Sequence, residues 1–207
     1  MNIVIVGAGN VGRALAAGWT GAGHKITLAV RDPSGSKAGE LKQQGFSVVA
    51  ANEAAAAAGE VIVLAVPWSA LANAVKNLGS LAGKIVIDAI NPLAPDRSLA
   101  VGHNDSAGET VARLAPGARV VKAFNTTGAS NMADSRYGTG KLLMLVAGDD
   151  QQAKQTTMLL ASDLGFEAVD AGPLAMSRYL EPMAMVWIRL ALVQQLGRNF
   201  GFALLRR

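Results

Sequence analysis

The sequence predicts an α/β protein with a doubly wound, mostly parallel sheet and a small C-terminal helical extension. Short, continuously apolar runs recur along the chain, and helix-compatible or loop segments separate most of them. Continuous apolarity is typical of strands that are covered on both faces, as in a parallel sheet. A glycine-rich turn directly after the first run supports the same class. The expected strands are NIVIV (2–6), KITLAV (25–30), FSVVA (46–50), VIVLAVP (61–67), KIVIDAI (84–90), RVVKAF (119–124), LLMLVAG (142–148) and FEAVDAG (166–172).

The composition limits the classes of function that the chain can serve. Its 207 residues, of which 51% are hydrophobic, can bury one good core. Lysine and arginine are scattered despite the net charge of +4, so we expect no nucleic-acid partner. The absence of cysteine excludes disulfides and thiolate chemistry. The apolar stretch 183–197 contains Arg189 and is too short for a bilayer, so we expect no membrane partner and a cytoplasmic location.

The segments between the strands carry helix and loop signals. The alanine-rich run at 53–59 predicts a short crossover helix, and Asp149 or Asp150 is the expected N-cap of a helix that ends near Gly165. The connections 91–109 and 125–141 are long and follow strands, which makes them candidate walls of a substrate crevice. From residue 174 onward we expect one or two helices, with breaks at Pro182, Gly197 and Gly201.

The first strand leads into a glycine-rich loop of the G-x-G-x-x-G pattern, which predicts a nucleotide-binding fold of the Rossmann type. Gly7 permits the tight turn, Gly9 lets a pyrophosphate approach the backbone, and Gly12 lets the helix pack close to the sheet. The strand before the loop and the helix and strand after it provide the required context. We therefore expect an NADP-binding domain over residues 1–172, with residues 173–207 as a helical extension of the same unit. The expected cofactor contacts in the loop are Gly7, Ala8, Gly9, Asn10, Val11 and Gly12.

The end of the second strand indicates which dinucleotide binds. NAD-binding proteins place a carboxylate about twenty residues beyond the motif, and this chain has Val30 there. Without that negative charge, Arg31 can bind a 2′-phosphate, and Lys37 can supply a second positive charge. The alternative is that Asp32 holds the ribose of NADH; otherwise Asp32 and Pro33 start the next helix. The sequence therefore favours NADPH over NADH.

Several segments together resemble the coenzyme F420-dependent NADP oxidoreductase family, which also supplies the nucleotide domain of membrane metalloreductases. The resemblance covers nearly the whole chain, and the later segments in this order are more specific than the glycine motif alone. The matching segments are GAGNVG, AVRD, VIVLAVPW, GKIVIDAINPL, VVKAFNTTGASNM, LVAGDD and VDAGPLAMSRYLEP. The resemblance implies hydride transfer between NADPH and a flavin-like deazaflavin. It also implies a Rossmann domain with a small C-terminal helical part.

The resemblance also implies the residues that surround the reacting rings. At the nicotinamide ribose and ring it places Ala65, Val66, Pro67 and Trp68, and near the reacting face Asn91, Ala123, Asn125, Thr126 and Thr127. Trp68 would stack on the substrate or only pack, and Asn125, Thr126 and Thr127 would bind it or only cap the loop. Family members that use F420 have a histidine where this chain has Asn125. This departure puts F420 itself in doubt and brings the chain closer to the metalloreductases.

The expected crevice contains little acid–base chemistry, so we predict no catalytic side chain and no metal site. Reduction of a flavin-type ring needs only that two rings are positioned, because solvent can supply the proton. His103 is a weak candidate proton donor. The expected function is an NADPH-dependent reductase of F420, a flavin or a similar planar acceptor, working as a homodimer. The alternatives are a non-catalytic NADPH-binding redox sensor and a small imine or carbonyl reductase.

Overall fold

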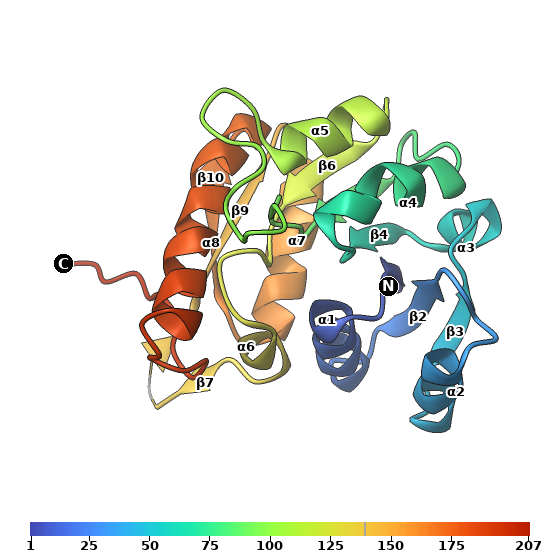
Figure 1. Cartoon of the computed structure of the whole chain (residues 1–207), viewed down its shortest axis with the longest axis horizontal. Coiled ribbons are helices and arrows are strands. Elements are labelled where there is room, and N and C mark those ends of the chain that lie inside the picture. The colour runs from blue at the N-terminus through green and yellow to red at the C-terminus, as the bar shows by residue number, and fades with distance from the viewer. Residues whose placement is uncertain (139) are drawn as a thin grey trace.

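An eight-stranded sheet forms the centre of the protein, with its strands in the order β10-β9-β6-β5-β4-β1-β2-β3 (Figure 1). The computed structural model describes residues 1–138 and 140–207. All of the predicted strands are present. Their bounds are β1 (Asn2–Val6), β2 (Lys25–Val30), β3 (Ser47–Ala50), β4 (Val61–Leu64), β5 (Ile85–Asp88), β6 (Arg119–Lys122), β9 (Leu143–Gly148) and β10 (Glu167–Gly172).

The sheet is mostly parallel, which confirms the predicted fold class. From β3 to β6 all neighbouring strands are parallel, in the order that is typical of the Rossmann fold. β9 runs antiparallel to β6, and β10 is parallel to β9. A parallel neighbour needs a crossover, usually a helix. In its described residues the β6–β9 connection holds only the short α6 (Ala129–Ala133) and a ribbon of β7 (Arg136–Tyr137) and β8 (Gly140–Lys141).

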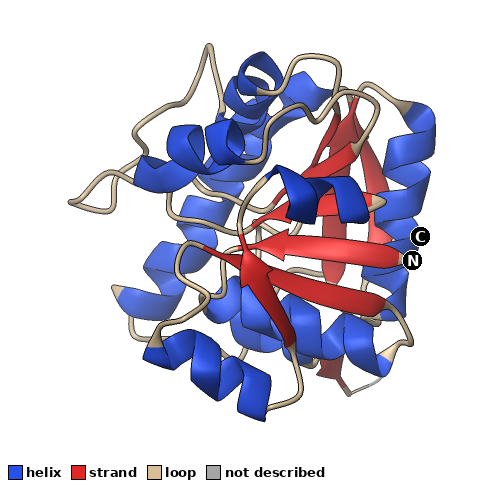
Figure 2. Cartoon of the chain, turned by 90° about the vertical axis from the view of Figure 1, so that its right-hand side faces the viewer, coloured by secondary structure: helices blue, strands red, loops and turns tan. Residues whose placement is uncertain are grey.

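Helices cover both faces of the sheet (Figure 2). One face packs against α1, α2 and α7, and the other against α3, α4 and α5, so alternate residues of β1 belong to different core clusters. Burial on both faces explains why the strands read as continuous apolar runs. The bounds are α1 (Asn10–Gly21), α2 (Ser36–Gln43), α3 (Glu53–Ala58), α4 (Leu71–Asn77), α5 (Ala107–Leu114), α7 (Gln151–Asp163) and α8 (Ser177–Leu192), with 3-10 turns η1 (Trp68–Ala70) and η2 (Leu174–Met176).

Local capping signals were right at one helix and wrong at another. Asp150 is the N-cap of α7, where its carboxylate accepts a hydrogen bond from Ala153 N, and Gly165 follows the helix with φ +85°. The prediction that Asp32 and Pro33 start a helix is wrong, because α2 begins at Ser36. Asp32 instead closes a turn, in which short aspartate side chains readily accept nearby backbone N–H groups.

The C-terminal part differs from the prediction at Pro182, which does not break α8. A proline inside a helix removes one backbone hydrogen bond. Here α8 is held by a buried face that includes Leu180, Ala184 and Trp187. Figure 1 shows α8 on the side of the molecule away from β2 and β3. Within the described residues, no helix has the length and apolarity needed to cross a bilayer.

Candidate functional site

The predicted nucleotide loop lies where the connections from β1 and β4 diverge. β1 leads to α1 on one face of the sheet, and β4 leads to α4 on the other. In open α/β sheets, ligands bind outside the carboxyl ends of the strands at this switch point. Residues 7–12 and 65–68 both lie here, so the fold brings together two segments that are distant in the sequence.

Each glycine of the loop meets a different steric condition. Gly7 has φ +104°, and a Cβ there would lie 2.5 Å from the carbonyl oxygen of Ala65. A Cβ at Gly12 would lie 2.0 Å from the carbonyl oxygen of Gly7, so no side chain is tolerated where α1 meets the loop. A Cβ at Gly9 would meet nothing within 4 Å. Gly9 therefore leaves open space beside the backbone, as the approach of a pyrophosphate requires.

The start of α1 offers backbone donors to an anion. Gly9 is the N-cap residue and makes no side-chain capping bond, and the first turn contains no acidic residue. The first N–H groups of a helix have no partner within the helix and carry a partial positive charge. With the open space at Gly9, this arrangement fits the phosphates of a dinucleotide.

A cavity of about 510 Å³, the Arg31 cavity, lies beside this loop at the end of β2. Among the described residues, no carboxylate lines it and Arg31 is the only charged residue that does. This is the electrostatic environment that the sequence predicted for a 2′-phosphate. The lining residues are Val6, Gly7, Ala8, Ala29, Val30, Arg31, Ala51, Val66, Pro67, Ser69, Ala70, Asn73, Ala74 and Asn77.

The two other charged candidates lie outside the lining of this cavity. The carboxylate of Asp32 accepts hydrogen bonds from Ser34 Oγ at 2.6 Å, Ser34 N at 3.0 Å and Gly35 N at 3.1 Å. The hydrogen bond from the Ser34 hydroxyl, followed by those from the backbone, lowers the pKa of Asp32. Lys37 is exposed on α2. The geometry thus favours Arg31 alone as the phosphate ligand, with Asp32 engaged in its turn.

A second cavity, of about 560 Å³, lies on the other side of the loop and is called the Asn125 cavity. Both cavities fall within the range of about 300–1,000 Å³ that is usual for small-molecule sites. It brings together the predicted residues Asn10, Val11, Asn91, Asn125 and Thr127. Its lining residues are Asn10, Val11, Arg13, Ala14, Asn91, Asn125, Thr127, Gly128, Ala129, Ser130, Ala133, Trp187, Ile188, Leu192 and Arg198.

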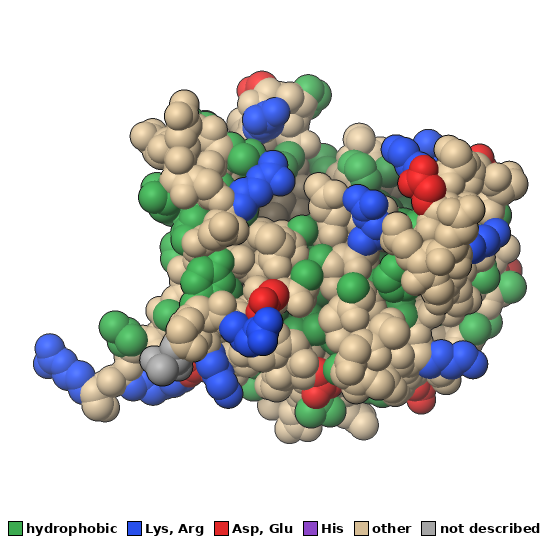
Figure 3. Space-filling model, turned by 90° about the horizontal axis from the view of Figure 1, so that it is seen from below, with side chains coloured by type: hydrophobic (Ala, Val, Ile, Leu, Met, Phe, Trp, Pro, Cys, Tyr) green, Lys and Arg blue, Asp and Glu red, His purple; other side chains and the backbone are tan. Residues whose placement is uncertain are grey.

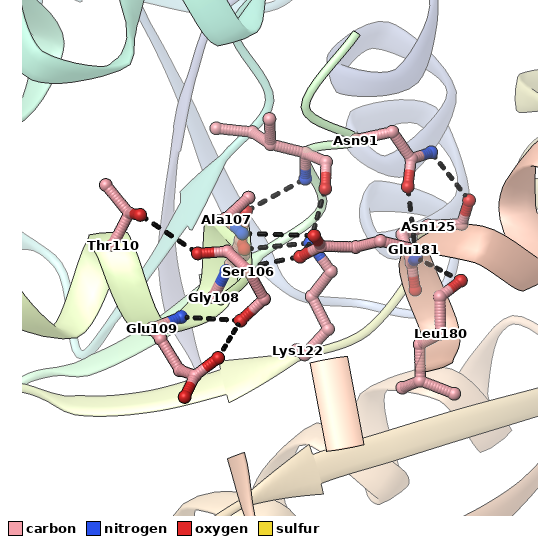
Figure 4. A network of polar contacts seen from close by, with 12 residues as sticks. Asn91, Ser106, Ala107, Gly108, Glu109, Thr110, Lys122, Asn125, Leu180 and Glu181 are labelled. Carbon is pink, nitrogen blue, oxygen red and sulfur yellow. Dashed lines mark hydrogen bonds and ion pairs between the residues drawn. The ribbon is translucent and has the colours of Figure 1, made fainter. Parts of the chain in front are cut away.

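The side-chain amide of Asn125 uses its Nδ2 in hydrogen bonds within the protein, whereas its Oδ1 has no partner in the described structure (Figure 4). Asn91 Nδ2 donates to the carbonyl oxygen of Asn125 at 2.9 Å, which turns Asn91 Oδ1 toward the Asn125 side chain. Asn125 Nδ2 donates to Asn91 Oδ1 and to the carbonyl oxygen of Leu180, both at 3.1 Å. Two acceptors thus fix the orientation of this amide. Asn125 Oδ1 is buried without a hydrogen-bond partner among the described residues.

Phe124 sets the backbone direction just before Asn125. It has φ +58°, a left-handed conformation that is uncommon for a bulky residue. Such a residue costs on the order of 1–3 kcal/mol and persists when its surroundings hold it. Phe124 is fully buried, and its ring meets Trp19 edge-on with centroids 5.4 Å apart. Packing thus holds the turn that presents Asn125.

The remaining predicted residues line neither cavity. Trp68 packs as a partly buried side chain against the core cluster beneath α4, and Thr126 and Ala123 are buried. Ala65 contributes its carbonyl group, which abuts Gly7. For Trp68 the geometry favours the packing role that the sequence left open.

Sequence reasoning missed a buried ion cluster next to this site, formed by Asp88, Lys122 and Glu181. Lys122 and Glu181 are labelled in Figure 4. Lys122 Nζ lies 2.9 Å from Asp88 Oδ2 and 2.8 Å from Glu181 Oε1, and it also donates to the carbonyl oxygen of Ile90. All three side chains are at most 1% exposed. Burial raises the pKa of Glu181, while the Lys122 charge opposes that shift. The only sequence signal was a charged residue within each of three apolar segments.

The cluster joins α8 to the rest of the site. Glu181 also accepts hydrogen bonds from Ala107 N at 3.0 Å and Gly108 N at 3.2 Å, at the start of α5. Lys122 contacts Ile90, the residue before Asn91, and Glu181 follows Leu180, which contacts Asn125. The position of α8 and the two cavity asparagines is therefore held by one polar network.

The apolar wall of the Asn125 cavity was also missed, because it comes from the C-terminal part. Trp187 Nε1 donates to the carbonyl oxygen of Phe200 at 3.0 Å, and the two rings stack with centroids 5.2 Å apart. A Cβ at Gly128 would lie 2.4 Å from the Trp187 ring, so glycine is needed for this approach. The periodicity of α8 indicates that Trp187 is buried but not which cavity it borders.

A second link between α8 and α5 supports a pH-dependent prediction. Arg178 Nε donates to Glu109 Oε2 at 2.9 Å, and this bond is the main reason why the pKa of Glu109 is lowered. A depressed carboxyl pKa adds stability above the unfolded value of 4.5, and this stability is lost as pH falls through the folded value. We expect Arg178→Met to cost about 0.2–1 kcal/mol at pH 7.

The difference in the free energy of unfolding between the unaltered protein and Arg178→Met should vanish at pH values below the folded pKa of Glu109. Urea unfolding of both proteins between pH 7 and pH 3 measures it. Lys76→Met, at an exposed lysine of α4 without an ion pair in the described structure, serves as the control. A cost of the Arg178 substitution that stays constant with pH would contradict the prediction.

The comparisons with known proteins support the same nucleotide chemistry. The family model for NADP oxidoreductase, coenzyme F420-dependent, matches residues 2–92. A protein from Arthrobacter sp. FB24, assigned as an F420-dependent NADP reductase, is 32% identical, with a TM-score of 0.88 over 99% of both chains. A reductive aminase from Aspergillus terreus in complex with NADPH is 22% identical, with a TM-score of 0.69 over 94% of this chain and 62% of its own. That likeness shows the fold alone.

A metalloreductase provides a further match. Metalloreductase STEAP3 of Rattus norvegicus is 33% identical over 182 residues, which are 87% of this chain. The chain spans only 36% of the length of that protein. The Arthrobacter protein, by contrast, is matched over nearly its full length at more than 30% identity. The chain therefore belongs to the family of coenzyme F420-dependent NADP oxidoreductases.

Proposed function

We propose that this protein transfers a hydride between NADP(H) and a flavin, a deazaflavin or a similar planar acceptor bound in the Asn125 cavity. One observation carries the proposal. The cavity borders the dinucleotide loop, yet among the residues that the structure describes no carboxylate, histidine, lysine or tyrosine lines it. Reduction of a carbonyl or imine calls for a positioned proton donor, whereas a flavin-type ring can take its proton from solvent.

The position of the cavity supports hydride transfer between a cofactor at the dinucleotide loop and an acceptor in the cavity. Asn10 and Val11 belong both to the start of α1 and to the cavity lining, so the cavity begins where the dinucleotide loop ends. When bound, NADPH supplies the hydride. The protein needs to bring two rings into contact and exclude water between them. The wall of Trp187, Ile188 and Leu192 offers the apolar surface for this purpose.

Asn125 is suited to orient one of the rings. Its Oδ1 is a buried acceptor that lacks a donor in the described structure, and burying such a group costs about 1–3 kcal/mol. The carboxamide of nicotinamide and the imide N–H of a flavin or deazaflavin are both suitable donors. Pairing with either one would remove this penalty on binding.

An acceptor screen tests the function. NADPH oxidation is followed without oxygen in the presence of F420, FMN, FAD and a quinone. Turnover with at least one of these acceptors is expected, and the reduced form of that acceptor should accumulate at the rate of NADPH loss. Tight NADPH binding with silence across all four acceptors would contradict the proposal and favour a redox sensor.

Asn125→Leu tests the role of the amide in the same assay. The side chain keeps its approximate size but loses Oδ1, so we expect kcat/KM for the acceptor to fall by about tenfold or more, as for the loss of about 1.4 kcal/mol. Ser162→Ala, at an exposed residue of α7, is the matched control and should leave the rate unchanged. A change confined to thermal stability would show that Asn125 only supports the loop.

We also propose that the protein is a homodimer that pairs through α8. Tyr179 and Val186 of α8 and Val193, its C-cap residue, are spaced by seven residues and are 68%, 52% and 57% exposed. An exposed apolar row at this spacing is typical of a helix that packs against another helix. Size-exclusion chromatography with light scattering at micromolar concentration should give a dimer, and Val186→Lys should give a monomer. A clean monomer of the unaltered chain would contradict the proposal.

A further inference from the structure

The Asn125 cavity carries positive charge that its own lining does not neutralise. Arg13 comes from α1 and Arg198 from the C-terminal segment, and no carboxylate of residues 1–138 or 140–207 lines the cavity. Arg13 donates to Asn10 Oδ1 at 3.2 Å, and neither arginine has an ion-pair partner within the described residues. Figure 3 shows one face of the molecule, on which basic side chains lie between apolar and uncharged surface and a hollow is visible. An anion in the cavity would meet two unopposed charges.

The lining divides into three parts of different chemistry. Asn91, Asn125 and Thr127 form a polar part, and Trp187, Ile188 and Leu192 form an apolar wall. The two arginines are exposed, so they lie where the cavity opens to solvent. A ligand that matches all three parts has a polar edge, a flat apolar body and an anionic group that extends toward solvent.

We propose that the Asn125 cavity selects acceptors that carry a phosphate on the ring side chain, and that Arg13 and Arg198 bind this phosphate. The proposal rests on the hydride-transfer function proposed above, because it names the acceptor class for the same site. Arginine matches phosphate oxygens with two parallel N–H groups, and such charge-assisted bonds are stronger than neutral ones. The unpartnered Oδ1 of Asn125, in a side chain only 4% exposed, independently indicates that a ligand completes this cavity.

The location of Arg13 presents a competing role. It lies in the first turns of α1, whose N-terminus faces the dinucleotide phosphates, so it could serve NADPH instead. Arg198 lies in the C-terminal segment, outside the dinucleotide loop and α1, and like Arg13 it lines the Asn125 cavity but not the Arg31 cavity. The affinity for NADPH in each variant therefore separates the two roles.

FMN and riboflavin provide the test, because they share one ring system and differ only in the phosphate. Binding is measured by quenching of flavin fluorescence in the presence of NADP⁺ and at low salt. We expect FMN to bind about tenfold more tightly than riboflavin, which corresponds to about 1.4 kcal/mol. Added salt should reduce the preference, since charges at a solvent-exposed rim are screened.

Arg198→Ala and Arg13→Ala should each weaken FMN binding by at most about tenfold, the size of the preference over riboflavin, and leave riboflavin binding unchanged. Arg189→Ala removes the same charge from an exposed position of α8 outside this cavity and is the matched control. Equal affinity for FMN and riboflavin, or no binding of either, would overturn the proposal. A loss of NADPH affinity in Arg13→Ala without a change for FMN would overturn the two-arginine site.

Because the readout is binding, its failure can be distinguished from failure of the proposed function. A preference for FMN that Arg198→Ala abolishes, together with no NADPH oxidation, would leave the phosphate site standing and exclude hydride transfer. Equal binding of FMN and riboflavin, with NADPH oxidised by both, would leave hydride transfer standing and exclude the phosphate site.

Discussion

Replacing Lys122 by methionine is expected to lower the free energy of unfolding by about 3–5 kcal/mol, as for other buried pairs that lose one partner. The reason is the environment of the groups left behind. Asp88 and Glu181 are both fully buried and separated from water, and Lys122 is the only cation that contacts them in the described structure. Methionine fills much of the lysine volume, so the loss reports on charge more than on packing. Urea denaturation at pH 7 measures it.

Lys154→Met is the matched control for this prediction. The Lys154 side chain is only 9% exposed, but its partner Asp170 is 35% exposed. The Asp170 carboxylate can therefore be solvated when Lys154 is replaced, and the free energy of unfolding should fall by no more than about 1 kcal/mol. Equal losses in the two variants would contradict the explanation by buried charge.

A combined variant tests whether the stability that Lys122→Met loses is due to the unpaired charges of Asp88 and Glu181. Asp88→Asn, Lys122→Met and Glu181→Gln together remove all three charges, so much of the stability that Lys122→Met loses should return. Because the same network holds Asn91 and Asn125, the combined variant should still bind its acceptor less well than the unaltered protein.

Arg31→Ala is expected to weaken NADPH binding by about tenfold to a hundredfold and to leave NADH binding unchanged, since charge-assisted hydrogen bonds contribute about 1.5–3 kcal/mol. In the described part of the chain, Arg31 is the only charged residue that lines its cavity. Dissociation constants for both cofactors, measured by titration at fixed salt, test the expectation. Equal affinity of the unaltered protein for NADPH and NADH would exclude a 2′-phosphate site here.

Two neighbouring residues serve as comparisons for Arg31. Lys37 was predicted to add a second charge, yet it lies outside the cavity lining, so Lys37→Ala should have little effect. Asp32→Asn should not weaken NADH binding if the carboxylate only closes its turn. A large effect of Asp32→Asn on NADH affinity would return Asp32 to the role of ribose ligand.

Strand positions could be predicted from the sequence because each strand is buried on both faces. Runs such as VIVL in β4 and IVIV in β1 consist of residues that must be apolar whichever face they occupy, so the pattern persists without knowledge of the partner. The glycine loop could also be predicted from the sequence, because the steric limits at Gly7 and Gly12 act within a few residues and across one neighbouring strand. The helix predicted at Asp32 failed because a turn and a cap begin with the same residue types.

The sequence alone was sufficient for the class of sheet, the dinucleotide loop and the basic residue at the end of β2, because short-range sterics and charge produce these features. The direction of β9, the cluster of Asp88, Lys122 and Glu181, and the walls of the Asn125 cavity depend on tertiary structure. Their members lie on separate elements, and only the folded chain brings a strand-end lysine next to a helix glutamate and a C-terminal arginine to the Asn125 cavity. Local pattern carries no information on such distances, since a charge inside an apolar segment identifies no partner.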